Sequence, residues 1–392
     1  MTTTQTRIFS STGYRDTWAE VSLDAIAHNA GLFRKQAAEG CRVMAVVKAN
    51  GYGHGAVQAA QAAIRAGAEY LGVALVDEAL QLRAAGISQP ILVLGYTPPH
   101  GVEMAVRHGV TLTVYTEDVL REAIACARKQ GREARIHLKY DTGMTRIGLP
   151  SAEAVTGMAA QVAAASPFVV LEGLFTHFAD ADGPDPAFTL EQFARFEACI
   201  DALEAVGLHI PIKHCCNSAA AMRFPWMHLD MIRVGIALYG LYPSALLQLP
   251  EYPLRQAMQL KSKIASLQRI EPGCTVGYGR SYRAAKERII ATIPVGYADG
   301  LSRALSNRGC ALVRRQRVPI IGRICMDQAM LDVTEAENVR AGDEVVIFGE
   351  NGAEASISID EVAAWMGTIN YEVVCLIGSR VPRVYPDAPQ FM

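Results

Sequence analysis

The sequence predicts an α/β protein with an N-terminal, TIM-like (β/α)8 barrel followed by a mostly β C-terminal domain. Short aliphatic and β-branched runs alternate with longer alanine-rich stretches up to about residue 245, eight such runs occur, and the pattern changes after about Tyr252. A chain of 392 residues is also long enough for two hydrophobic cores. We expect the barrel domain over residues 18–250 and the second domain over residues 251–392.

The number of runs favours a barrel. The segments between them have helical periodicity, as in Glu117–Lys129 and Leu190–Val206. Eight strand–helix units within about 225 residues match the count and length of a (β/α)8 barrel. A doubly wound sheet is the alternative that this pattern leaves open. The predicted strands are Val43–Val47, Leu71–Leu75, Ile91–Leu94, Val110–Val114, Arg135–Lys139, Val169–Phe175, Ile210–His214 and Met231–Ile236.

The C-terminal part has strand-like runs separated by turn signals, such as Pro272-Gly273 and Asp299-Gly300. One helix is predicted to begin at Ser358, because Glu361 three residues later completes a capping-box pattern. The predicted strands are Gln259–Gln268, Arg288–Pro294, Ala311–Val313, Val318–Ile321, Ala329–Val333 and Glu344–Phe348.

Composition excludes several classes of partner and location. The chain has 37 basic and 39 acidic residues, so nucleic acid and anionic membrane surfaces are poor partners. Its nine cysteines include no C-x-x-C pair, which favours reduced thiols. No segment has the roughly 18 uninterrupted apolar residues of a membrane span, and the first residues lack the apolar core of a secretory signal. We therefore expect a cytoplasmic protein.

Reactive side chains follow the predicted strands at their carboxyl ends, where (β/α)8 barrels place their active sites. Lys48 is the most informative, because it directly follows the apolar run VMAVV. Burial lowers the pKa of a lysine, and the neutral amine can then attack an aldehyde. Glycines in the following KANGYGHG let the backbone approach a ligand closely. Other polar residues end or follow the predicted strands, and Arg233 lies within the last one. Those at the strand ends are Lys139, Asp141, His177, Asn217 and Ser218.

A series of motifs resembles the alanine racemase family along nearly the whole chain. AVVKANGYGHG is similar to the family's cofactor-attachment signature, and eight further motifs follow in the family's order. These are LKYDTGMTRIG (138–148), GLFTHFA (173–179), CNSAA (216–220), MIRVGIALYG (231–240), GYGRSY (277–282), PVGYADG (294–300), GRICMDQ (322–328) and NYEVVCLIGSRVPR (370–383).

The resemblance implies a pyridoxal-phosphate-dependent enzyme that interconverts L-alanine and D-alanine. Residues 1–17 would join the second domain. Lys48 would carry the cofactor and act as the base on one face of the substrate, and Tyr278 would serve the opposite face. In the family this tyrosine comes from the second subunit, which implies a homodimer with shared active sites. D-alanine biosynthesis is the corresponding role, and alanine catabolism is the alternative that the sequence leaves open.

The remaining roles also follow from the resemblance. His177 would assist Tyr278, and it would be linked to Arg233, which donates a hydrogen bond to the pyridine nitrogen of the cofactor. The residues that would bind the cofactor phosphate are Tyr52, Ser218 and the backbone of Gly235 and Ile236. Those that would form the substrate pocket are Arg146, Met326, Asp327 and Tyr297. Lys139 resembles a lysine that is carbamylated in many relatives and orients the substrate-binding arginine.

Purely structural interpretations exist for most of these residues. Lys48 could belong to a buried ion pair, Ser218 could be a simple helix cap and His177 could be a core histidine. Related functions also compete. Barrel decarboxylases normally present a carboxylate to the pyridine nitrogen, and single-barrel cofactor-carrier proteins lack a second domain and a counterpart of Tyr278. Arg233 and the length of the chain disfavour both.

One position departs from the family pattern. Ser379 stands in IGSRVPR where the family commonly has a tyrosine that borders the substrate. A smaller, more polar residue there would enlarge the pocket. This departure leaves a serine racemase or a broad-specificity amino-acid racemase as the alternative to an alanine racemase.

Overall fold

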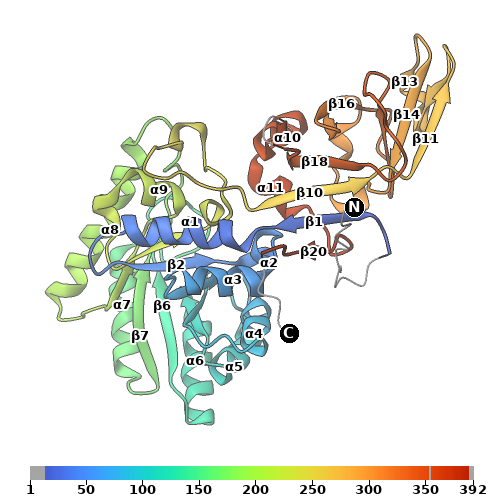
Figure 1. Ribbon diagram of the computed structural model, residues 1–392. Coiled ribbons are helices and arrows are strands. Elements are labelled where there is room, and N and C mark those ends of the chain that lie inside the picture. Colours follow the sequence, from blue (N-terminus) through green and yellow to red (C-terminus); the bar gives the residue numbers. More distant parts are fainter. Residues whose placement is uncertain (1–13, 353–354, 388–392) are drawn as a thin grey trace. The chain divides into compact units, whose positions relative to one another are not determined.

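The computed structural model describes residues 14–352 and 355–387, which form two compact units (Figure 1). One unit is Leu23–Ala257. The other combines the described residues up to Ser22 with those from Met258 onward. The chain therefore changes unit after Ala257, close to the boundary expected after residue 250. Residues 1–13, which the resemblance assigns to the second domain, lie outside the described residues.

The first unit is a nearly closed barrel of eight parallel strands in the order β8-β7-β6-β5-β4-β3-β2-β9. Backbone hydrogen bonds join its two end strands, from Arg233 N to Cys216 O (3.0 Å) and from Asp230 N to Lys213 O (3.1 Å). The barrel is confirmed, and the doubly wound alternative is wrong. The strands are β2 (Arg42–Val46), β3 (Tyr70–Val73), β4 (Ile91–Val93), β5 (Thr111–Val114), β6 (Ala134–Lys139), β7 (Val169–Phe175), β8 (Ile212–His214) and β9 (Met231–Val234).

Helices follow the strands and cover the outside of this barrel, so most strand residues are buried on both faces. The alanines explain part of the packing: α3 buries Ala56, Ala59, Ala60, Ala62 and Ala63. The helices are α1 (Leu23–Gln36), α2 (Lys48–Tyr52), α3 (Ala56–Arg65), α4 (Val76–Ala84), α5 (Pro99–Arg107), α6 (Glu117–Gln130), α7 (Ala152–Ala164), α8 (Ala187–Ala205) and α9 (Ser218–Arg223).

The second unit is built on one long sheet in the order β11-β14-β17-β16-β15-β18-β10-β1-β20. Its pairs are antiparallel except β1 with β20. β19 pairs with β18, and β12 pairs with β13 in a small separate sheet. The strands are β1 (Thr17–Val21), β10 (Met258–Lys263), β11 (Ser266–Ile270), β12 (Thr275–Val276), β13 (Tyr282–Arg283), β14 (Arg288–Ile293), β15 (Cys310–Val313), β16 (Gln316–Ile321), β17 (Ala329–Asp332), β18 (Glu344–Glu350), β19 (Ser356–Ile357) and β20 (Arg383–Val384).

The described residues of this unit form two α-helices, α10 (Ile359–Met366) and α11 (Asn370–Cys375). Helix α10 begins as its sequence predicts. Ser358 Oγ accepts a hydrogen bond from Glu361 N (3.1 Å), and the Glu361 carboxylate accepts one from Ser358 N (3.0 Å). Among the described residues of the whole chain, no helix is both long and apolar enough to cross a membrane.

Candidate functional site

The carboxyl end of the barrel gathers the predicted residues of the first unit. The ammonium of Lys48 lies 6.0 Å from the centre of the Tyr52 ring. The guanidinium of Arg233 contacts His177, with Nη2 at 3.2 Å from Nδ1. Ser218 contacts Gly235, whose N–H donates to the serine Oγ at 2.8 Å.

The segment after Lys48 is a left-handed turn. Ala49, Asn50 and Tyr52 have φ values of 52°, 53° and 50°, which cost L-residues about 1–2 kcal/mol each. Two hydrogen bonds hold this strained turn: Asn50 Oδ1 accepts from Ala56 N (3.1 Å), and Glu78 Oε1 accepts from Ala49 N (2.6 Å). Strain of this kind persists where surrounding contacts determine the backbone, most often at functional sites. Here it turns Tyr52 back toward the barrel end that carries Lys48.

Tyr52, Ser218, Gly235 and Ile236 form a cradle suited to a phosphate group. Asn217 caps α9 by accepting from Ala220 N (2.9 Å), so Ser218 is the first residue of that helix. A Cβ on Gly235 would lie 2.8 Å from the Tyr52 hydroxyl, so only glycine permits this close approach. Hydroxyl groups and backbone N–H groups at helix starts are the ordinary ligands of phosphate.

Arg233 is buried and its hydrogen-bond partners are neutral. Nη1 donates to His214 Nδ1 (2.9 Å). The two hydrogens of Nη2 are shared among three acceptors, the carbonyl oxygens of Thr176 (2.9 Å) and Cys215 (2.9 Å) and Nδ1 of His177 (3.2 Å). Burial lowers the pKa of Arg233 to about 10, so it remains protonated at neutral pH. Within the described part of the chain no carboxylate pairs with it. A fixed donor of this kind fits a neutral pyridine nitrogen.

His177 is neutral and its tautomer is determined. Burial, and then the charges of Arg233 and Lys139, hold the pKa of His177 well below 6.5. Because Arg233 donates to Nδ1, that nitrogen must be the acceptor. The ring proton is therefore on Nε2, which makes Nε2 a hydrogen-bond donor.

Lys139 and Arg146 lie at the end of β6 and in the loop after it. Lys139 is buried, with its ammonium 4.4 Å from the centre of the Phe175 ring. Burial, and then the charges of Arg233 and Arg146, lower the pKa of Lys139 to about 7. Asp141 orders the loop by accepting from Gly143 N and Thr145 N, both at 3.0 Å. The exposed Arg146 follows that turn.

The other predicted residues lie in the second unit. Tyr278 is 72% exposed, which is unusual for a large aromatic side chain, and it lines a cavity together with Cys325. Met326 and Tyr297 are also exposed. Their two loops are joined by hydrogen bonds from Tyr297 N to Cys325 O and from Ala298 N to Met326 O, both 3.0 Å.

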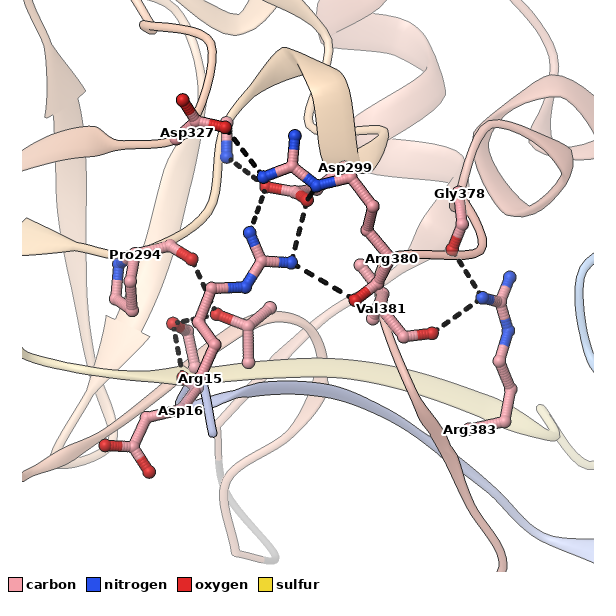
Figure 2. A network of polar contacts seen from close by, with 12 residues as sticks. Arg15, Asp16, Pro294, Asp299, Asp327, Gly378, Arg380, Val381 and Arg383 are labelled. Atoms are coloured by element: carbon pink, nitrogen blue, oxygen red, sulfur yellow. Dashed lines mark hydrogen bonds and ion pairs between the residues drawn. The ribbon is translucent and has the colours of Figure 1, made fainter. Parts of the chain in front are cut away.

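An ion network connects Asp299, which follows Tyr297, with Asp327, which follows Met326 (Figure 2). The Asp299 carboxylate is fully buried and accepts two hydrogen bonds from Arg15, at 2.8 and 2.9 Å. It also lies 3.4 Å from Nε of Arg380, whose Nη2 donates to Asp327 at 2.7 Å. Arg380 is the neighbour of Ser379 in the chain. The network therefore joins the loop of Tyr297, the loop of Asp327 and the segment that carries Ser379.

Sequence reasoning assigned no role to Asp299, Arg15, Arg380 or His214. Arg15 and Arg380 lie outside helices and strands, and Asp299 ends a short 3-10 helix. The ion pair of Arg15 with Asp299 joins positions 284 residues apart. No local pattern reveals such a pairing. His214 ends a predicted strand, so the same criterion that selected His177 could have selected it.

Comparisons with known proteins agree over nearly the whole length of the chain. The chain matches the family model of the alanine racemase N-terminal domain over residues 21–243 and that of the C-terminal domain over residues 257–385. It is 52% identical to alanine racemase 2 of Oceanobacillus iheyensis, over 95% of this chain and 94% of that one. Two solved structures are similar: alanine racemase from Bacillus anthracis with bound L-Ala-P (40% identity, TM-score 0.90, 96% of both chains) and histidine racemase from Leuconostoc mesenteroides (30% identity, TM-score 0.87, 96% and 99%).

Proposed function

The chain belongs to the alanine racemase family, depends on pyridoxal phosphate and racemises alanine, and we propose that it does so with two acid–base residues, Lys48 and Tyr278. Racemisation removes the α-proton on one face of the substrate and returns it on the other, so two groups must act from opposite sides. The observation that carries this proposal is the position of Lys48, which follows an apolar strand at the end of the barrel where the donors for the cofactor also lie.

The cofactor, when bound, supplies an electron sink for the carbanion that deprotonation creates. Tyr52, Ser218 and the backbone of Gly235 and Ile236 would hold its phosphate. Arg233 would donate to its pyridine nitrogen without transferring a proton, because a guanidinium is retained in the protonated form at neutral pH. This limits the strength of the sink, which favours rapid reprotonation over side reactions. The decarboxylase and carrier interpretations are excluded by the match to both racemase domains.

We propose that Tyr278 acts in the active site of a second copy of the chain, which makes a homodimer with shared sites the active form. Its exposure in the single chain supports this, because a partner would cover the ring. A phenol has a reference pKa near 10 and needs assistance to lose its proton at neutral pH. Nε2 of His177 is the group that would provide it, because it is a donor and would stabilise the phenolate.

Substrate binding would use residues from both units. Arg146 would bind the substrate carboxylate through its guanidinium fork. Met326, Asp327 and Tyr297 would complete the pocket from the partner subunit, positioned by the Asp299 network. Lys139 would be carbamylated: a neutral amine is the reactive form, and its pKa of about 7 supplies that form near neutral pH. The resulting anion would face Arg146.

A serine or broad-specificity racemase is the second candidate, favoured by Ser379. This residue is exposed and follows Gly378, which hydrogen-bonds to the Asp299 carbonyl oxygen. A serine side chain leaves space and a hydroxyl where a tyrosine ring would stand.

We propose D-alanine supply in the cytoplasm as the physiological role. The nine free cysteines support a reducing compartment.

The decay of optical rotation tests the function directly. Purified protein with added cofactor is given L-alanine and L-serine in parallel. Faster loss of rotation with alanine supports an alanine racemase, and faster loss with serine supports the second candidate. Lys48→Ala should abolish the decay and the visible absorption of lysine-bound cofactor. A variant that still racemises either substrate at the wild-type rate would refute the role of Lys48.

A further inference from the structure

We propose that Glu172 is a positioning residue for Arg233, acting through His137 and His214 in a hydrogen-bond chain that runs in one direction inside the barrel. This inference rests on the proposed role of Arg233 at the cofactor. The four side chains of this hydrogen-bond chain come from four strands, β9, β8, β6 and β7. Arg233 Nη1 lies 2.9 Å from His214 Nδ1, His214 Nε2 lies 2.9 Å from His137 Nδ1, and His137 Nε2 lies 3.2 Å from Glu172 Oε2.

The direction of this chain follows from the donors available at its two ends. A guanidinium has no acceptor, so His214 Nδ1 must accept from Arg233. The neutral His214 ring then carries its proton on Nε2 and donates it to His137 Nδ1. His137 in turn carries its proton on Nε2 and donates to Glu172. Each member is thereby limited to one tautomer and one orientation.

Doubly protonated rings are incompatible with these distances. A protonated His214 could not accept from Arg233, and a protonated His137 would place two N–H groups against each other across 2.9 Å. The environment agrees. Burial and the charge of Arg233 lower the pKa of His214 well below 6.5, and burial lowers the pKa of His137.

The barrel is shaped to admit these rings. Interiors of such barrels are usually filled with branched aliphatic side chains. Here a Cβ at Gly173 would lie 2.5 Å from the His137 ring, so the glycine on β7 makes the space that the ring occupies. The register of β6 against β7 shifts between Ile136 and His137, which re-aims the histidine. His214 stacks on Phe175 with centroids 4.8 Å apart and planes at 5°.

Glu172 supplies a constant negative charge at the far end. Only 13% of its side chain is exposed. Burial alone would raise the pKa of Glu172, but hydrogen bonds from His137 and Tyr70 lower it to about 2. The Tyr70 hydroxyl donates at 2.6 Å, and Thr111 Oγ1 and Arg135 Nη1 each lie 3.2 Å from its oxygens. The carboxylate therefore remains ionised at any working pH and always accepts from His137.

The consequence for Arg233 is a fixed guanidinium. Hydrogen bonds that point the same way polarise one another. A histidine ring that donates a hydrogen bond from one nitrogen therefore becomes a stronger acceptor at its other nitrogen. His214 thus holds Nη1 firmly, and Nε of Arg233 has no hydrogen-bond partner within the described residues. Nε is the atom we assign to the pyridine nitrogen. Glu172 would set the strength and direction of that contact without touching the cofactor.

The test compares Glu172→Gln with Glu133→Gln in the holoenzyme. Both changes remove a carboxylate that contacts Arg135, but Glu133 has no contact with the histidine chain. We expect kcat of the Glu172 variant to fall about tenfold, the size of one charge-assisted hydrogen bond, with KM changed by less than about twofold. The absorption band of the bound cofactor should shift in that variant alone. The Glu133 variant should match the wild type within about twofold.

Nitrogen-15 NMR of histidine-labelled holoenzyme gives a readout independent of activity. In the wild type, His137 and His214 should both be neutral with the proton on Nε2, and in Glu172→Gln His137 should populate the other tautomer as well. A wild-type His214 protonated on Nδ1, or equal kcat and tautomers in the two variants, would overturn the inference. The wild-type spectrum needs no variant to fold. Failure of the racemase proposal would appear instead as wild-type protein that does not racemise alanine.

Discussion

Arg233 donates a hydrogen bond from Nη2 to Nδ1 of His177 across 3.2 Å, and this contact leaves the imidazole proton on Nε2. A protonated His177 could not accept the bond, and burial keeps the pKa of the ring well below 6.5. One buried arginine therefore determines which nitrogen of the histidine can act as a donor toward a phenol. The same arginine is the proposed donor to the cofactor ring, so the proposed cofactor contact and the proposed helper of Tyr278 depend on one side chain.

Tyr278→Phe should slow exchange of the α-proton of L-alanine more than that of D-alanine. The change removes the proposed acid–base group on one face and leaves Lys48 on the other. Loss of a positioned acid–base group typically costs roughly 10²–10⁴-fold. The measurement is exchange of the α-proton in deuterated water, followed by NMR for each enantiomer separately. Equal slowing of both enantiomers would contradict the assignment of one base to each face.

Acidification from pH 7 to pH 5 should destabilise the protein through His137, His177, His214 and His228. Burial is the largest cause that lowers the pKa of each of these four rings below 6.5. Unfolded histidines titrate near 6.5, so below that pH the unfolded state binds more protons and the free energy of unfolding falls. The loss is at most about 1.4 kcal/mol per pH unit for each ring.

Urea unfolding at several pH values between 7 and 5 measures this loss. Glu172 does not contribute to the change in the free energy of unfolding between pH 7 and pH 5. Because its pKa is lowered to about 2, its stabilising contribution is lost only below pH 4.5. His209→Gln, which replaces an exposed histidine, should keep the same slope. A free energy of unfolding that does not change over this range would show that none of these four rings resists protonation.

Lys139 should bind carbon dioxide as a carbamate. The neutral Nζ forms a bond to the carbon of carbon dioxide and releases one proton, so only the deprotonated amine reacts. Since the pKa of Lys139 is lowered to about 7, carbamate formation should increase as the pH rises from 6 to 8. Carbon-13 NMR of protein equilibrated with labelled bicarbonate should show a signal that Lys139→Ala removes. Lys263→Ala, at a half-exposed lysine paired with Asp16, should retain the signal.

The barrel could be predicted from the sequence because each of its strands can be recognised from the residues of that strand alone. Most residues of the parallel strands are buried, so a largely apolar run marks a strand without reference to any other strand. The polar residues that follow these runs then fall at one end of the barrel by topology alone. This is why Lys48 and His177 could be selected from the sequence.

The second unit shows where local information is insufficient. Gln259–Gln268 reads as one strand, but the chain changes partners in the middle. Ile264 N donates to Asp343 O (3.0 Å), and Ala265 N donates to Thr292 O (2.8 Å), so β10 ends at Lys263 and β11 starts at Ser266. The pairing partners lie far along the chain, and nothing in the ten residues indicates the change. The Asp299 ion network escaped prediction for the same reason.

Ser379→Tyr should lower activity toward L-serine relative to L-alanine. The serine leaves room for a hydroxymethyl group, whereas a tyrosine ring would occupy that space. A difference of one small group typically changes selectivity by roughly 1–3 kcal/mol, so the serine-to-alanine ratio of kcat/KM should fall by at least about tenfold. Ser379→Ala separates volume from polarity, because it keeps the space and removes the hydroxyl. A ratio that Ser379→Tyr leaves unchanged would show that this position does not border the substrate, whereas a fall in both variants would assign the preference to the hydroxyl itself.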